Sequence, residues 1–179
     1  MNDVSNALLH PFQPVVDEQS RVLVLGSFPS VKSRANAFYY GHPQNRFWKL
    51  LSILLAEPLP VSVSDKTSLL HRNHIALWDV VRQCDIIGSS DSSLTAYAFN
   101  DIPSLITGTQ IHTIFANGQK AGKLYQSHLS VTTGMPVHIL PSTSPANALW
   151  TLDRLMEAWQ PLRAAIFENQ VKYEEHLWK

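Results

Sequence analysis

The sequence predicts an α/β fold with three layers, in which helices cover both faces of a central, mostly parallel sheet of four strands. Four short apolar runs have the length and composition of buried strands; they are residues 21–25, 74–81, 111–116 and 136–140. Helical patterns separate these runs along the chain. Strands that alternate with helices form a parallel sheet covered on both faces.

The expected helices also follow from hydrophobic periodicity, at residues 46–56, 64–72, 117–129 and about 147–171. Pro161 lies within the last stretch and should kink that helix or divide it in two, because proline cannot continue the hydrogen-bond ladder. Residues 58–60 and 88–93 have the composition of surface loops. The first twenty residues contain two prolines and little periodicity, so we expect an N-terminal segment that wraps the surface.

Composition limits the classes of protein that this chain can represent. Its 179 residues suit a single domain over residues 1–179, and 45% hydrophobic with 16% charged residues is typical of a globular protein. Fourteen basic residues balance fourteen acidic ones, so any nucleic-acid binding must use a local patch. A single cysteine, Cys84, fits a reducing compartment, and neither a membrane span nor a signal peptide is expected. A monomer in the cytoplasm is the simplest expectation.

Each apolar run ends in a polar cluster. The clusters are residues 26–30, Trp78 with Asp79, residues 117–120 and residues 141–145. The carboxyl ends of parallel strands lie along one edge of a sheet, where open α/β sheets bind ligands. We therefore expect these four segments to converge on one pocket.

Several familiar chemistries are absent. The Gly26-Ser27 pair lacks the second glycine of a hydrolase nucleophile elbow, and neither phosphate-binding glycine motif occurs, so no nucleotide cofactor is expected. His71 and His74 could share a metal, but no further ligand cluster accompanies them. Histidines at a helix C-terminus, where they complement the helix dipole, are the preferred interpretation, and no metal is expected.

Two other stretches allow a structural and a functional interpretation. The aromatic run at residues 38–48 could be a core plug or could stack on a nucleobase, and Arg46 and Lys49 could lie on a solvated helix face or contact phosphate. In the late loop, Ser144 before Pro145 is a helix start signal, and a helix N-terminus also binds phosphate well.

Three motifs together carry a resemblance to a known family. They are Gly26-Ser27-Phe28-Pro29-Ser30 with Tyr-Tyr-Gly-His-Pro-Gln-Asn-Arg-Phe-Trp behind it, Leu77-Trp78-Asp79-Val80-Val81, and Leu140-Pro141-Ser142-Thr143-Ser144-Pro145-Ala146-Asn147, with support from the turn that begins at Asn117. In this order and spacing, over roughly residues 20 to 155, the sequence resembles the uracil-DNA glycosylase superfamily. Within it, the chain is most similar to the hypoxanthine-DNA (deoxyinosine) glycosylases, often called family 6. The resemblance implies the three-layer fold of that superfamily.

Two departures from the wider superfamily argue against efficient uracil excision. Phe28 stands where many members carry an Asp or Asn that positions water, and Leu140 stands where uracil-specific members carry a His. Both fit the family 6 pattern, in which the resemblance implies that the catalytic asparagine is Asn45. Its amide would orient the attacking water.

The resemblance implies a DNA repair enzyme that flips hypoxanthine out of DNA and hydrolyses its N-glycosidic bond. The expected base-binding residues are Ser27, Phe28 as pocket floor, Tyr40 stacking on the base, Asp79 accepting from N1–H, and Asn117. Asp79 could equally be a structural carboxylate, and Asp79 or His42 could assist catalysis. The expected DNA-binding loop is Pro141, Ser142, Thr143, Ser144, Pro145, Ala146 and Asn147, with Pro145 and Ala146 as a wedge. Broader uracil or xanthine specificity, a non-catalytic binder of damaged or single-stranded DNA and a nucleoside hydrolase remain alternatives.

Overall fold

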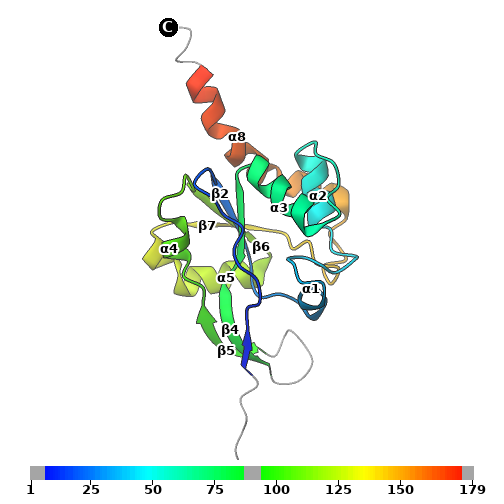
Figure 1. Cartoon of the computed structure of the whole chain (residues 1–179), viewed down its shortest axis with the longest axis vertical. Helices are drawn as coiled ribbons and strands as arrows, with labels where there is room; N and C mark the ends of the chain where they lie inside the picture. Colours follow the sequence, from blue (N-terminus) through cyan, green and yellow to red (C-terminus); the bar gives the residue numbers. More distant parts are fainter. Residues whose placement is uncertain (1–6, 87–93, 175–179) are drawn as a thin grey trace, which may run out of the picture.

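A parallel four-stranded sheet forms the centre of the structure, a computed structural model that describes residues 7–86 and 94–174 (Figure 1). Its order is β3–β2–β6–β7. The strands are β2 (Val22–Gly26), β3 (Ile75–Asp79), β6 (Thr113–Asn117) and β7 (Val137–Leu140). All three pairings are parallel, so the predicted sheet is confirmed.

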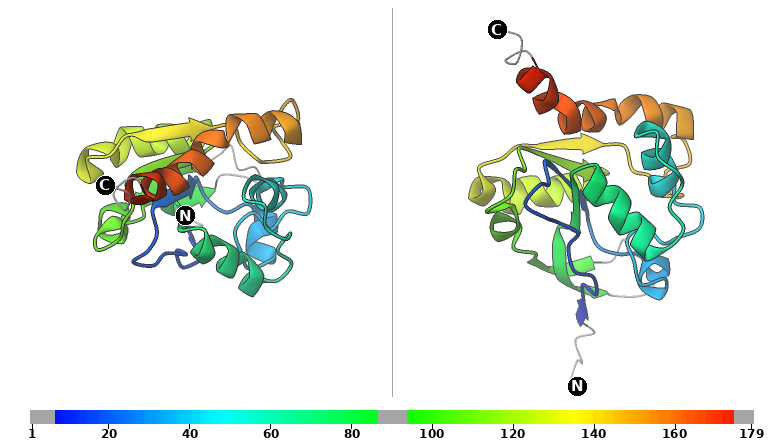
Figure 2. Two further views of the ribbon diagram at one scale, coloured as in Figure 1. Left: turned by 90° about the horizontal axis from the view of Figure 1, so that it is seen from above. Right: turned by 45° about the horizontal axis from the view of Figure 1, so that its top comes forward.

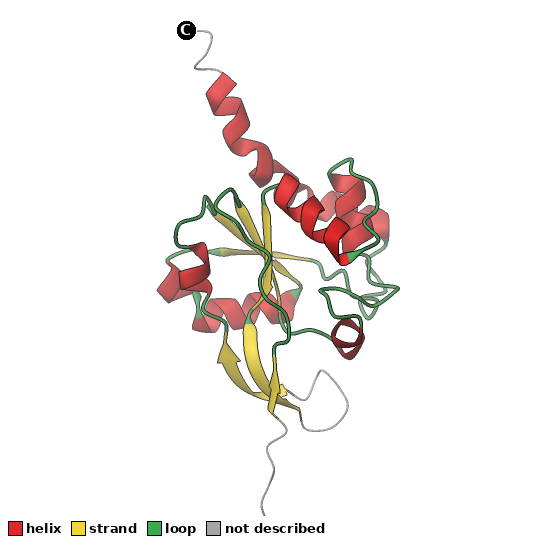
Figure 3. Ribbon diagram, viewed as in Figure 1, coloured by secondary structure: helices red, strands yellow, loops and turns green. Residues whose placement is uncertain are grey.

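Side chains of the central strands alternate between two cores, one on each face of the sheet. Val22 and Val24 pack into one core, whereas Leu23 and Leu25 pack into the other. The first core is covered by α2 (Phe47–Leu54), α3 (Val63–Arg72), α7 (Leu152–Ala158) and α8 (Gln160–Glu174). The second is covered by α4 (Ile102–Ile106) and α5 (Gln119–His128), and α6 (Ser130–Thr133) follows α5. Helices therefore lie on both sides of the strands, as the sequence predicts (Figure 3).

A second sheet was not predicted. It is antiparallel, with order β1–β4–β5, from β1 (Ala7–Leu9), β4 (Val81–Ile86) and β5 (Leu94–Phe99). The expected strand at 74–81 is divided because the chain turns after Asp79, where the Val80 and Val81 amides donate to the Gly26 and Ser27 carbonyls. The loop expected at 88–93 lies outside the described residues. This sheet and α8 lie at opposite ends of the molecule (Figures 1 and 2).

The C-terminal helical region differs from expectation in where it begins. The predicted helix start at Ser144 and Pro145 is wrong, since α7 begins at Leu152 with Thr151 as its N-cap. Several carbonyls of the preceding loop accept from the Arg46 guanidinium instead of from helical amides. The predicted division is confirmed, because α7 ends before Trp159 and Pro161 is the second residue of α8.

The N-terminal segment is more than a surface wrapping. Residues 9–16, here called the N-terminal strap, run beside β3, where Val15 and Leu77 exchange backbone hydrogen bonds of 2.9 and 2.8 Å. Val15 is buried in the core, and the side chain of Ser20, further along the segment, is buried as well. Among the described helices, none is long and apolar enough to cross a membrane.

Candidate active site

A pocket of about 160 Å³ opens at the carboxyl ends of the central strands. The sheet register explains why it forms there, since Gly26 pairs with Asp79 and Asn117 pairs with Leu140. The pocket brings together Asn45 and all of the expected base-binding residues, whereas His42, considered as a second catalytic group, does not line it. Its lining is Gly26, Ser27, Phe28, Pro29, Ser30, Ser33, Tyr39, Tyr40, Asn45, Asp79, Asn117, Ser142, Thr143 and Ser144. Of the expected DNA-binding loop, only Ser142, Thr143 and Ser144 reach it.

Asn45 is held in the pocket by a short hydrogen-bond network. Its Oδ1 accepts from the Phe47 backbone amide at 3.0 Å and from the Thr143 hydroxyl at 2.9 Å. Thr143 is fully buried; its Oγ1 accepts from Asn117 Nδ2 at 2.9 Å, and its backbone amide donates to Asn117 Oδ1 at 3.0 Å. Asn45, Asn117 and Thr143 therefore come from three distant segments and fix one another.

The backbone amides of Phe47 and Thr143 determine the direction of this network. A backbone N–H can only donate, so each amide must face the oxygen of its asparagine partner. Both lone pairs of Asn45 Oδ1 are then engaged. Within the described chain, Asn45 Nδ2 makes no hydrogen bond, so the amide hydrogens are the part of Asn45 that is available to a ligand.

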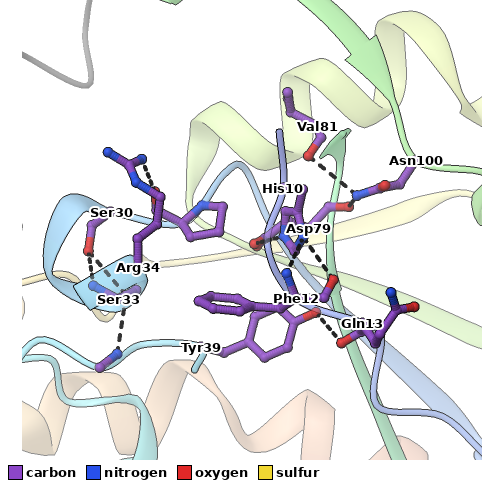
Figure 4. Close-up of polar contacts among 12 residues, drawn as sticks. His10, Phe12, Gln13, Ser30, Ser33, Arg34, Tyr39, Asp79, Val81 and Asn100 are labelled. Carbon is purple, nitrogen blue, oxygen red and sulfur yellow. Dashed lines mark hydrogen bonds and ion pairs between the residues drawn. The ribbon is translucent and has the colours of Figure 1, made fainter. Parts of the chain in front are cut away.

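Asp79, at the end of β3, is held from behind by a residue that the sequence interpretation missed. His10 of the N-terminal strap places Nε2 2.7 Å from Asp79 Oδ2, and the two side chains are 2% and 5% exposed (Figure 4). Asn100 donates to the Asp79 carbonyl at 2.8 Å and so fixes the backbone of the same turn. The local sequence offers one indication that His10 is buried. It is flanked by Leu8-Leu9 on one side and by Pro11-Phe12 on the other, in a segment without periodicity.

The other carboxylate oxygen of Asp79 lies over Gly26. A Cβ added to Gly26 would lie 2.2 Å from Asp79 Oδ1 and 3.0 Å from the Tyr40 hydroxyl. A side chain at this position would therefore collide with the carboxylate. The absence of a Cβ at Gly26 lets the ends of β2 and β3 stand together with Asp79 facing the pocket.

Tyr39 and Tyr40 occupy different environments although they are adjacent. The Tyr39 hydroxyl donates to the Gln13 carbonyl of the strap at 2.8 Å. The Tyr40 ring packs on Phe47 with centroids 4.1 Å apart, and its buried hydroxyl lies beside Asn117 but makes no hydrogen bond of acceptable geometry within the described chain. Burial, with the Asp79 charge added, raises the pKa of both hydroxyls, so both stay protonated.

Phe28 forms part of the pocket wall from a half-buried position. Its ring lies edge-on to His10 at 5.9 Å, and the Arg34 guanidinium lies 5.8 Å from the ring centroid. Arg34 also donates to the Pro29 carbonyl at 2.9 Å, and Ser30 caps the short helix α1 (Val31–Ala35). These local hydrogen bonds fix Pro29 and Ser30, which directly follow Ser27 and Phe28.

Arg46 takes neither of the roles considered from the sequence. Its guanidinium donates to loop carbonyls, at 3.3 Å for Thr143, 2.6 Å for Ser144 and 3.1 Å for Asn147, and it also bonds the Trp150 carbonyl. Asn45 and Arg46 thus both tie the aromatic segment to the late loop. Exposed apolar side chains remain at the outside of this loop, above all Leu149, which is 82% exposed.

The remaining histidines lie away from the pocket lining. His42 Nδ1 accepts from the Gln44 amide at 3.1 Å. His71 lies in the last turn of α3, as expected, with Nδ1 2.7 Å from Asp17 Oδ2, and His74 follows that helix. No group of three or more potential metal ligands occurs among residues 7–86 and 94–174.

Comparisons with known proteins found related sequences and a related structure. A family model described as the uracil DNA glycosylase superfamily matches residues 13–163. A protein from Methanosarcina acetivorans named Hypoxanthine DNA glycosylase is 36% identical over 151 residues, which cover 83% of this chain and 94% of that relative. One of the same name from Methanosarcina barkeri is 35% identical over 138 residues, with coverages of 76% and 86%.

A solved structure shows the same fold. It is a solution NMR structure of a candidate uracil DNA glycosylase from Methanosarcina acetivorans, with a TM-score of 0.74 and 34% identity. The similarity covers 86% of this chain and 96% of the other. Since the family model and these relatives each span most of the sequence, the chain belongs to the uracil DNA glycosylase superfamily.

Proposed function

We propose that this protein is a DNA repair glycosylase that removes hypoxanthine, the deaminated form of adenine, and leaves an abasic site. One observation carries the proposal: Asn45 with free amide hydrogens and the Asp79 carboxylate line the same pocket at the sheet edge. The similar relatives named Hypoxanthine DNA glycosylase support this choice of base.

The target nucleotide must leave the helix before it reaches the pocket. Flipping it out costs a few kcal/mol, which is lowest for a mispaired base. The pocket of about 160 Å³ at the sheet edge is the proposed site for the flipped base.

Asp79 is the proposed reader of the base. Hypoxanthine carries a hydrogen on N1, whereas adenine presents a lone pair there. A carboxylate oxygen accepts from N1–H but repels the adenine lone pair, and a buried polar group left without a partner gives strong discrimination. Ser27, Asn117 and the rings of Phe28 and Tyr40 complete the base-binding wall. Tyr40 is half-buried and lines the pocket, so its ring is the proposed stacking partner of the base.

Asn45 is the proposed catalytic residue. Its amide cannot act as a base at neutral pH, so it positions water, which accepts a hydrogen bond from Nδ2 and directs its other lone pair at C1′. The water oxygen bonds to C1′ as the C1′–N9 bond breaks, the bond electrons leave with the base, and the proton of the water passes to solvent. Of the two titratable groups considered, Asp79 and His42, Asp79 is the one in the pocket lining.

Residues 141–149 are the proposed DNA-contact loop. The Ser142 and Ser144 oxygens accept from loop amides at 3.2 and 3.3 Å, and their hydroxyl hydrogens remain available to phosphate. Pro145 and Ala146 were the expected wedge. Leu149, larger and 82% exposed, is a better candidate to fill the gap left by the flipped base.

Base release from duplexes that contain inosine, uracil or xanthine tests the proposed function. Alkali cleaves the abasic strand, and we expect the fastest single-turnover cleavage for inosine. Asn45→Ala should slow it by about 100-fold or more, the scale of a lost catalytic interaction. Gln44→Ala, an exposed neighbour, is the matched control and should retain the wild-type rate.

The other outcomes of this assay would each indicate a different function. Equal release of uracil or xanthine means broader specificity, which the buried Leu140 at the position of the usual histidine argues against. Tight binding of the inosine duplex without base release means a damage-binding protein. Full activity of Asn45→Ala would show that another residue positions the water. We further propose that the enzyme acts as a cytoplasmic monomer.

A further inference from the structure

The N-terminal strap contributes a side chain to the catalytic edge of the sheet. It is anchored at both ends, since the His10 amide donates to the Arg82 carbonyl at 2.7 Å and Val15 pairs with Leu77. Between these points the Tyr39 hydroxyl binds the Gln13 carbonyl. The position of His10 is therefore set by the fold.

The His10 ring is fixed at both nitrogens and on its faces. Nε2 lies 2.7 Å from Asp79 Oδ2, and Nδ1 lies 2.9 Å from the Phe12 carbonyl oxygen and 3.2 Å from the Phe12 amide. The ring centroids of Phe12, Phe28 and Tyr39 lie 5.7, 5.9 and 6.0 Å from that of His10. Figure 4 shows Phe12 and Tyr39 beside His10. Among the described residues, His10 is the hydrogen-bond partner of the Asp79 carboxylate.

A carboxylate as buried as that of Asp79 requires a partner. A buried charge without one is strongly unfavourable and would rotate away or become protonated. A carboxylate that had turned away would no longer present an oxygen to N1–H of the base. With His10 on Oδ2, the second oxygen Oδ1 stays over Gly26, where the pocket lies.

We propose that His10 is a positioning residue for base recognition, which holds Asp79 so that Oδ1 alone faces the flipped base. His10 acts through Asp79 and does not touch the base, since the pocket lining contains Asp79 and not His10. The proposal rests on the proposed function. It makes the N-terminal strap a part of the specificity site.

A double-mutant cycle tests this role. His10→Phe keeps a ring among the aromatic neighbours but removes the donor, and His10→Gln restores a donor near the place of Nε2. Each is combined with Asp79→Asn, and single-turnover rate constants on inosine duplex are measured together with the amplitude, which reports the active fraction. A merely structural role would lower the amplitude and leave the rate constant unchanged.

We expect His10→Phe to lower the rate constant about tenfold or more in the wild-type background and less than about threefold when Asp79 is already Asn. His10→Gln should recover part of the rate, and it keeps the test informative should the Phe variant fail to fold. The matched control is His71→Phe, which breaks a His–Asp contact of the same 2.7 Å length outside the pocket and should change nothing in catalysis.

Two results would overturn the inference. One is an unchanged rate constant in both His10 variants. The other is an equal loss in the wild-type and Asp79→Asn backgrounds, which would mean that His10 does not act through Asp79. If the wild-type protein releases no hypoxanthine, the proposed function itself fails, so the two failures are distinguishable.

Discussion

Removing the Tyr40 hydroxyl should make the protein more stable. This hydroxyl is buried without a hydrogen-bond partner in the described chain, and the ring lies against Phe47. A buried unpaired hydroxyl costs about 1–3 kcal/mol, and the small void left by its removal offsets part of the gain. Tyr40→Phe should therefore raise the free energy of unfolding by about 1 kcal/mol, or the melting temperature by roughly 2–4 °C for a chain of this length.

The neighbouring tyrosine provides a control of opposite sign. Tyr39→Phe removes the 2.8 Å hydrogen bond to the Gln13 carbonyl and should cost about 1 kcal/mol. Urea unfolding of both variants measures the two changes under identical conditions. Excision should fall far less in Tyr40→Phe than in Tyr40→Ala, because the phenylalanine ring can still stack on a base. A Tyr40→Phe protein less stable than wild type would refute the reasoning and show that the hydroxyl is used.

Three further predictions concern the loop, the asparagine network and acid stability. Arg46→Lys should lower the free energy of unfolding by about 2 kcal/mol and slow excision at least tenfold, because a lysine cannot donate to four carbonyls at once. An unchanged urea midpoint and excision rate would mean that these hydrogen bonds contribute neither to stability nor to catalysis. Thr143→Val should slow excision by about tenfold with a smaller effect on DNA binding, because it removes the hydroxyl that links Asn45 to Asn117. Single-turnover kinetics measure the excision rate and titration measures DNA affinity, and an equal loss of rate and affinity would contradict this prediction. Hydrogen bonds from Arg72 and then Asn73 lower the pKa of Glu57 below its usual 4.5, so its contribution to stability is present above about pH 4.5 and lost as the pH falls through the folded value. Glu57→Gln should flatten the acid limb of urea midpoints plotted against pH, and an unaltered limb would assign that slope to other carboxylates.

Local sequence patterns predicted the features that depend on local physics. Apolar runs with polar ends located the central strands, and parallel topology then placed Ser27, Asp79 and Asn117 at one edge without further information. This is why the pocket lining agrees with the expected catalytic and base-binding residues. Their chemical roles remain predictions.

The features that escaped prediction depend on distant partners. His10 meets Asp79 across 69 positions, and nothing near His10 in the sequence indicates that contact. The helix start signal at Ser144 and Pro145 was overridden by Arg46, a residue almost one hundred positions away. The β4–β5 pairing was hidden because β4, Val-Arg-Gln-Cys-Asp-Ile, has a weak apolar alternation.

The Arg46 contacts limit how the late loop can be engineered. Arg46 binds backbone carbonyls, which every residue type possesses, so it constrains the path of residues 143–150 while leaving most of their side chains free to change. Exposed positions such as Ala146 and Leu149 could be randomised to alter lesion context or affinity while the register of Asn45 is preserved. Insertions within the same stretch would displace the carbonyls from the guanidinium. A library built on this enzyme should therefore vary composition at constant loop length.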